Sequence, residues 1–224
     1  RLLGEKQVDW TGELVSIPTV NPYSGDASAA SEAAGQDWMD ERLTELGAVT
    51  TRIAVPVDVY SRGGVLGPAG RDWTGRENVV GEWSFADGGP TIVLNNHMDT
   101  VGTADMEVDP YEPVIDDGVM YGRGTSDTKG NMVMGLVAME ALLADAGALR
   151  GRVIFESVVD EECNGGGAGT LACCLAGVRG DMAICLDGGR DRLVTGCNGI
   201  ATARVVVRGR SGHSSAGYSV SAID

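Results

Sequence analysis

The alternation of short apolar strands with helices is the feature that most constrains the fold of this chain. Residues Thr91–Leu94 and Val153–Val159 are short apolar runs, typical of strands buried on both faces of a sheet. Between them, Lys129–Ala146 has the length of a helix and is apolar almost all round, which predicts a helix packed between layers. We therefore expect an α/β three-layer sandwich with a mostly parallel central sheet.

Weaker patterns complete this alternation. Apolar periodicity and turn residues predict helices over Glu5–Val15, Ser28–Leu46 and Ala168–Leu175, and strands over Ala48–Val55, Asn78–Trp83 and Met182–Leu186. The glycine-rich segment Ser61–Arg76 and the polar segment Asp105–Tyr121 are expected to be loops.

The pattern changes from Gly199 onward. Residues Ala201–Arg208 alternate apolar and polar side chains, which predicts a half-exposed strand of a second sheet. We therefore expect one domain over residues 1–198 and the beginning of a second over residues 199–224. The chain starts with Arg1 rather than Met, and it stops soon after the new pattern begins, so we expect a piece of a longer protein.

The charge of the chain limits its partners. It carries 17 basic and 32 acidic residues, a formal net charge of −15. Such a chain repels phosphate backbones, so we expect no nucleic-acid partner. No apolar run approaches the roughly 20 residues that span a bilayer, so we expect no membrane partner either. The charge fits a solvated acidic surface, with a high-salt cytoplasm as the alternative interpretation.

The cysteines indicate a reducing compartment. There are five, an odd number without a CxxC pair: Cys163, Cys173, Cys174, Cys185 and Cys197. This usage is unlike a secreted disulfide framework or a cysteine zinc site. We therefore expect reduced thiols and a cytoplasmic location.

Four polar clusters are each expected at the carboxyl end of a buried strand, where open α/β sheets bind ligands. The first, Asn95–Asp99, contains His97 and Asp99; this spacing lets an imidazole bind a metal while a carboxylate orients it, although a hydrogen-bonded histidine is the commoner alternative. Another, Asp160–Glu162, places three consecutive carboxylates after an apolar strand. If these lie in a cleft, a cation or a shared proton must compensate their repulsion.

The two remaining clusters have ordinary alternatives. Gly122–Asp127 superficially resembles a dinucleotide-binding loop, but Asp127 occupies the place of the third glycine and would repel a pyrophosphate. An aspartate that caps the following helix is the alternative there. Asp187 lies in Asp187–Gly189, which an ordinary turn would also explain. Together, however, one imidazole and several carboxylates form a ligand set suited to Zn²⁺, Co²⁺ or Mn²⁺, and an aspartate could bridge two ions about 3.5–4 Å apart.

These motifs resemble the dinuclear zinc amidohydrolase and peptidase family of acetylornithine deacetylase, succinyl-diaminopimelate desuccinylase, aminoacylase-1 and glutamate carboxypeptidase. The stretches that carry the resemblance are Leu94–Val101, Tyr121–Gly130 and Val158–Glu162, together with Ser16–Pro22 and Val207–Ser214. Intervals of 30, 35 and 25 residues, which also fit this family, separate His97, Asp127, Glu162 and Asp187. The resemblance covers essentially the whole chain and implies a zinc-peptidase-like sandwich.

The resemblance also implies a pair of metal ions. His97 and Asp187 would hold one ion and Glu162 the other, while Asp127 would bridge them. Zn²⁺ is the expected metal, with Co²⁺ or Mn²⁺ as alternatives. Many relatives place a glutamate at the position of Asp187, which leaves the subfamily open.

Further residues take catalytic roles by the same resemblance. Asp99 would support His97 from behind, and Glu161 would act as general base and general acid. The family also suggests a cis peptide bond between Asp127 and Thr128. Residues 199–224 match the start of an α+β lid or dimerisation domain, in which His213 would reach an active site and stabilise the oxyanion.

We therefore expect a metal-dependent hydrolase of the amide bond of N-acyl amino acids, similar to acetylornithine deacetylase and succinyl-diaminopimelate desuccinylase, and a homodimer through its lid when full length. A dipeptidase or carboxypeptidase of the same family is the first alternative. A non-catalytic relative that binds metal or an amino acid is the second, and a nucleotide-binding α/β protein is disfavoured by Asp127 and the acidic charge. The last histidine ligand of the family is absent from residues 1–224, so we expect this fragment alone to be inactive.

Overall fold

The computed structural model describes residues 2–163, 166–188, 192–196, 198–199 and 205–208. The chain divides into two units, residues 1–193 and 194–224. In the second unit, residues 205–208 are exposed and form no strand, in contrast to the strand expected over Ala201–Arg208; residues 201–204 lie outside the described residues. A strand needs a neighbour to bind its backbone groups, and the described residues of this unit provide none. The expected domain boundary at residue 198 stays a prediction.

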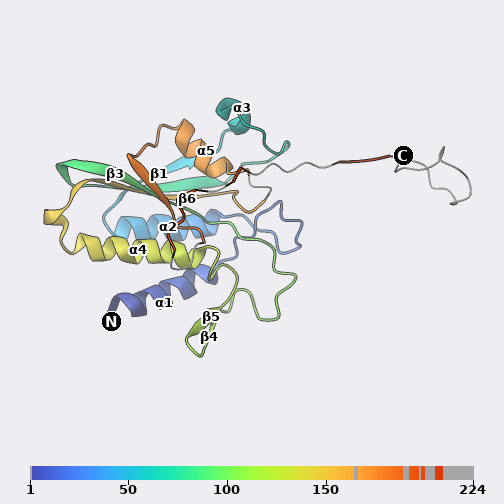
Figure 1. Ribbon diagram of the computed structural model, residues 1–224. Helices are drawn as coiled ribbons and strands as arrows, with labels where there is room; N and C mark the ends of the chain where they lie inside the picture. Colours follow the sequence, from blue (N-terminus) through green and yellow to red (C-terminus); the bar gives the residue numbers. More distant parts are fainter. Residues whose placement is uncertain (1, 164–165, 189–191, 197, 200–204, 209–224) are drawn as a thin grey trace, which may run out of the picture. The chain divides into compact units, whose positions relative to one another are not determined.

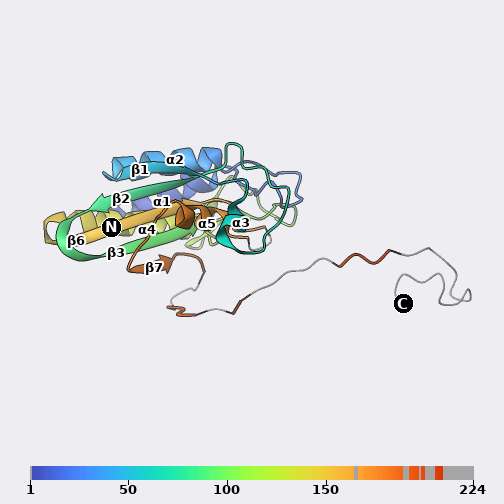
Figure 2. The ribbon, with the colours of Figure 1, turned by 90° about the horizontal axis from the view of Figure 1, so that it is seen from above.

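The first unit is built on one central sheet of mostly parallel strands. Its strands are β1 (Val49–Ala54), β2 (Glu77–Ser84), β3 (Ala86–His97), β6 (Arg150–Val158) and β7 (Met182–Cys185). They lie in the order β1-β2-β6-β3-β7, which Figure 2 shows from above. β3 is parallel to β6 and β7, whereas β2 is antiparallel to β1 and β6. Four strands therefore run in one direction, which confirms the expected mostly parallel sheet.

Helices cover both faces of the sheet, so the three-layer architecture is confirmed (Figure 1). On one face lie α1 (Leu2–Val15), α2 (Ala33–Glu45) and α4 (Lys129–Leu143); on the other lie α3 (Val59–Gly63) and α5 (Ala168–Leu175). The larger core fills the first interface, where Met39 of α2 and Leu136 of α4 pack with Phe155 of β6. A smaller core joins α5 to the opposite face of β6. No helix among the described residues is long and apolar enough to cross a membrane.

Helix α4 lies between the sheet and α1, as its composition predicts. Its side chains Met132, Val133 and Leu136 are fully buried. Met134 and Leu142 are exposed, however, because α1 and the sheet do not cover the whole circumference of the helix. The helix also ends at Leu143, three residues earlier than expected.

Three short elements occur in the segments expected to be loops. Helix α3 overlaps the first of these, and β4 (Val114–Asp116) pairs with β5 (Val119–Tyr121) within the second. The turn between these strands is Asp117-Gly118, with positive φ at both residues. This dipeptide is typical of a tight hairpin turn, and it is the local signal from which the hairpin could have been predicted.

Candidate metal centre

The carboxyl edge of the central sheet brings together most of the predicted site residues. His97 ends β3 and is aligned with Val158 at the end of β6, so the Asp160–Glu162 run follows at the same edge. Strand β7 ends at Cys185, aligned with Asn95, and Asp187 follows two residues later. Register alone therefore places an imidazole and two acidic segments on one edge.

The expectation that a buried strand precedes every cluster is wrong in two cases. All four residues of β7 are exposed, because β7 is the edge strand of the sheet among the described residues. The Gly122–Asp127 cluster follows β5, which belongs to the separate two-stranded hairpin and not to the central sheet. The chain nevertheless returns from this hairpin to the sheet edge and delivers Asp127 there.

Three carboxylates surround the outer nitrogen of the His97 ring. Nε2 lies 3.2 Å from Oδ1 of Asp127, 3.7 Å from Oε2 of Glu161 and 3.8 Å from Oδ2 of Asp187. This nitrogen is buried and has no hydrogen-bond partner among the described residues. One ligand atom each from His97, Asp127 and Asp187 can be chosen so that all three lie within 4.8 Å of one another. The arrangement therefore has the composition and size of a metal site.

Asp127 does not serve as a helix cap. The residue at the N-terminus of α4 is Thr128, and its side chain makes no capping hydrogen bond. The Asp127 carboxylate is instead mostly exposed and faces His97. The peptide bond between Asp127 and Thr128 is cis, which confirms the feature that the resemblance implied.

The expected contact between His97 and Asp99 is present, but the hydrogen bond to the ring uses the main chain. Nδ1 of His97 lies 2.9 Å from the Asp99 carbonyl oxygen and 3.6 Å from carboxylate Oδ1. The Asp99 carboxylate accepts hydrogen bonds from the backbone N–H groups of Glu161 (3.1 Å) and Glu162 (3.0 Å). Asp99 therefore contacts the His97 ring through its carbonyl and the backbone of the two glutamates through its carboxylate.

The mutual field of these groups shifts their pKa values. Burial alone would lower the pKa of His97, but the carboxylates of Asp127, Asp99 and Glu161 outweigh it and raise the pKa to about 9. Burial raises the pKa of Glu161, and burial together with the charge of Asp127 raises the pKa of Glu162 to about 7. A cation among these side chains would favour their deprotonated forms.

Glu162 and His213 are not part of the group around His97 in the described structure. The Glu162 side chain is half-buried and within the field of Asp127, but it does not join the group formed by His97, Asp127 and Asp187. His213 lies outside the described residues. The roles assigned to these side chains stay predictions.

The sequence did not reveal a buried polar network beneath the site. Arg76 binds both carboxylate oxygens of Glu32 and one of Asp160. Asn21 then donates to Asp160 and to Asp99. Asn21 lies in a motif that carries the family resemblance, but the pattern assigned it no role, and Arg76 and Glu32 had no local signal.

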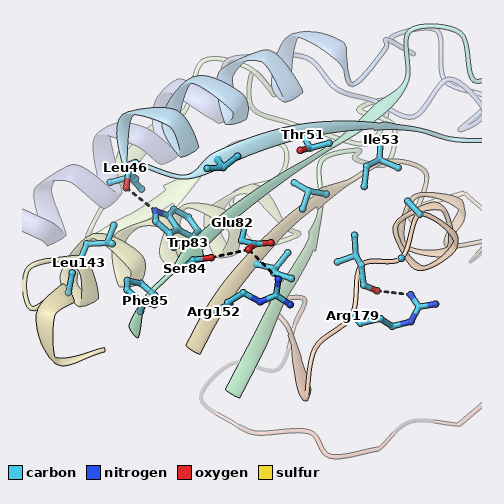
Figure 3. Close-up of a pocket in the computed structure, with 18 residues that line it drawn as sticks. Leu46, Thr51, Ile53, Glu82, Trp83, Ser84, Phe85, Leu143, Arg152 and Arg179 are labelled. Carbon is cyan, nitrogen blue, oxygen red and sulfur yellow. Dashed lines mark hydrogen bonds and ion pairs between the residues drawn. The ribbon is translucent and has the colours of Figure 1, made fainter. Parts of the chain in front are cut away.

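A pocket on the surface lies away from the predicted site residues. It has a volume of about 940 Å³, and Figure 3 shows Trp83, Phe85 and Arg152 in its lining. Arg152 lies near the start of β6, whereas Val158 and the metal site lie at the other end of the strand. The pocket is mostly apolar, and its paired charges, Arg152 and Glu82, are partly exposed. It therefore lacks the converging carboxylates of the metal site.

Comparisons of the sequence with known proteins agree with this geometry. The sequence model of peptidase family M20/M25/M40 matches residues 93–202. The N-formyl-4-amino-5-aminomethyl-2-methylpyrimidine deformylase of Bacillus subtilis is 30% identical over 213 residues, 92% of this chain and 45% of the relative. The chain thus spans less than half of the length of the curated relatives it matches.

Solved structures show the same fold. Human carnosine dipeptidase 1 matches with a TM-score of 0.60 and 19% identity, over 84% of this chain and 40% of that chain. An M20 family metallo-carboxypeptidase from Sulfolobus solfataricus matches with a TM-score of 0.59 and 17% identity, over 82% and 38%. The sequence model of this family therefore matches part of the chain, and the solved structures share its fold.

Proposed function

We propose that this chain belongs to peptidase family M20/M25/M40 and forms the metal-binding part of a hydrolase that cleaves the amide bond of an N-acyl amino acid. The observation that carries the proposal is the buried Nε2 of His97, which makes no well-aligned hydrogen bond among the described residues and lies 3.2 to 3.8 Å from oxygens of three carboxylates. A buried polar atom without a partner is costly, and a divalent cation would satisfy it and the carboxylates together.

The donor set supports two neighbouring ions. His97, Asp127 and Asp187 would hold the first, because their ligand atoms already cluster. Asp127 would bridge to a second ion held by Glu162, which shares its field. Nitrogen and oxygen donors of this kind suit Zn²⁺, with Co²⁺ or Mn²⁺ as alternatives. When bound, such ions lower the pKa of water and polarise a carbonyl.

Glu161 is the residue proposed to move the proton. Its carboxylate is half-exposed beside His97, and burial raises its pKa toward the range of an efficient general base. It would take the proton of the attacking water as the carbon–oxygen bond forms. It would then give that proton to the amine nitrogen as the carbon–nitrogen bond breaks.

The relatives favour removal of an acyl group over cleavage of a peptide. The deformylase, by its name an enzyme that removes a formyl group, is 30% identical across nearly the whole chain. The peptidases resemble this chain at 19% and 17% identity, a level that speaks for the fold alone. A dipeptidase or carboxypeptidase activity remains the alternative because the solved neighbours bear those names.

Three further parts of the proposal rest on the family resemblance. They are the role of His213 at the oxyanion, homodimerisation through a lid that starts at residue 199, and a cytoplasmic location with reduced thiols. Cys163, Cys173, Cys174 and Cys185 are free in the structure, which is compatible with that location.

The test combines metal binding with turnover. On the natural polypeptide that carries these residues, Glu161→Gln should retain Co²⁺ or Zn²⁺ but release amine from N-formyl, N-acetyl or N-succinyl amino acids at least about a hundredfold more slowly. Glu82→Gln, at the far end of the sheet, is the matched control and should remain active. Dipeptides in the same panel distinguish the alternative peptidase activity from removal of an acyl group. Undiminished turnover in Glu161→Gln would remove the mechanism, and metal binding without any turnover would favour a non-catalytic relative.

A further inference from the structure

Asp160 differs in environment from the two glutamates that follow it. Its side chain is completely buried, whereas Glu161 and Glu162 are only half-buried. Its backbone has a φ of 63°, a left-handed conformation that aspartate tolerates better than most residues and that turns the chain sharply after β6. Asp160 therefore points into the protein while its neighbours reach the site.

A guanidinium holds this inward carboxylate. Nη2 of Arg76 lies 3.1 Å from Oδ1 of Asp160 and 2.5 Å from Oε1 of Glu32, while Nε lies 2.8 Å from Oε2 of Glu32. The three side chains are each at most 3% exposed. Only the planar fork of arginine can bind one carboxylate through two nitrogens and share one of these with a second carboxylate.

The network continues to the backbone of the site. Nδ2 of Asn21 bridges Asp160, at 3.2 Å, and Oδ2 of Asp99, at 2.7 Å. The same Asp99 carboxylate accepts the backbone N–H groups of Glu161 and Glu162. An unbroken chain of hydrogen bonds therefore runs from Arg76 to the backbone that carries both glutamates.

We propose that Arg76 is a positioning residue that fixes the Asp160–Glu162 turn, and with it both glutamates, before any metal binds. It acts at a distance through Asp160 and Asn21. By neutralising Asp160 it also keeps the third carboxylate of this acidic run out of the metal site. The inference rests on the proposed function only in taking Glu161 and Glu162 as parts of that site.

Amide hydrogen exchange in the metal-free, ¹⁵N-labelled chain tests this inference. In Arg76→Lys, one ammonium cannot hold both carboxylates, so the N–H groups of Glu161 and Glu162 should exchange at least about tenfold faster. The N–H of Leu186, bound to the Asn95 carbonyl at the same sheet edge, should keep its rate. Because local opening sets these rates, a loss of overall stability alone does not reproduce the pattern.

Leu43→Ala is the matched control for overall stability. Leu43 is fully buried on α2 and takes no part in the polar network, so this variant should unfold more easily without faster exchange at Glu161 and Glu162. As a second measurement, Co²⁺ affinity should fall about 10- to 100-fold in Arg76→Lys, the usual effect of losing an outer hydrogen-bond partner, and remain within about threefold in Leu43→Ala.

Arg76→Met removes the charge altogether and should give a larger effect. If Arg76→Met fails to fold, Glu32→Gln replaces it and is tested together with Arg76→Lys. Glutamine keeps the shape of the Glu32 side chain but binds the Arg76 guanidinium more weakly. Unchanged exchange at Glu161 and Glu162 in these two folded variants overturns the inference. Since exchange is measured without metal or substrate, faster exchange supports it even if no amide is hydrolysed, and the proposed function then fails separately.

Discussion

Lys129, at the start of α4, should make the stability of this protein rise with pH. Its side chain is completely buried, and Nζ donates to the backbone carbonyls of Leu14 (3.1 Å) and Ile17 (2.6 Å). Burial lowers the pKa of Lys129 from 10.5 to about 7, because the ammonium loses its hydration. Replacement by methionine keeps the approximate volume and removes the titrating group.

The number of protons bound by the folded and unfolded chains determines whether stability rises or falls with pH. Between pH 7 and 10.5 the unfolded chain keeps a proton on Lys129 that the folded chain releases, so raising the pH favours the folded state. Each pH unit in this window contributes about 1.4 kcal/mol. From pH 7.5 to 9.5, the wild type should gain roughly 2 to 3 kcal/mol relative to Lys129→Met. Below pH 7 the difference should be constant, because both states are then protonated.

Urea denaturation of the metal-free, reduced chain at pH 7.5, 8.5 and 9.5 measures this difference. Titration of other groups, His97 among them, cancels when the two proteins are subtracted at each pH. Leu136→Ala is the matched control: it removes a fully buried side chain from the same helix without a charge, so its deficit should not depend on pH. A difference between wild type and Lys129→Met that stays flat from pH 7.5 to 9.5 would refute the reasoning. The two carbonyl contacts would then be sufficient to hold the ammonium.

Two further predictions concern a glycine of α4 and the imidazole of His97. Gly130→Ala on α4 should destabilise the fold, although alanine favours helices by about 1 kcal/mol, because the new Cβ would clash with the backbone carbonyl oxygen of Thr125. Gly12→Ala on α1, where the nearest atom is 3.9 Å away, should stabilise the fold, and thermal unfolding compares the two variants. Co²⁺ affinity should rise up to about tenfold per pH unit from pH 6.5 to 8.5, since the raised pKa of His97 makes a proton compete with the metal; a flat profile by titration calorimetry would contradict this.

The sheet and its functional edge could be predicted because they depend on local patterns. Apolar runs specify buried strands such as β6, and the ends of parallel strands meet at one edge whatever connects them. The placement of His97 beside the acidic run therefore needed no knowledge of distant contacts. The position of Asp127 was less accessible, since it depends on the path of a chain that first forms the exposed hairpin of β4 and β5.

The network around Arg76 could not be predicted, because its members are far apart in the sequence. Arg76 is 44 residues from Glu32 and 84 residues from Asp160, and no periodic pattern relates them. A buried ion pair of this kind depends on tertiary geometry, since each charge tolerates burial only when its partner is already in place.

The unpredicted ion pair with Arg76 changes the interpretation of the Asp160–Glu162 run. Three consecutive carboxylates after a buried strand indicate a compensating cation or a shared proton if they lie in a cleft. In the structure, Asp160 is compensated by the guanidinium of Arg76, so this one carboxylate needs no metal. Glu161, Glu162 and the carboxylates near His97 have no such partner, and burial first, then the neighbouring carboxylates, raise the pKa values of both glutamates. The case for a metal therefore rests on the buried Nε2 of His97 and the carboxylates around it, while Asp160 is paired with Arg76 inside the protein.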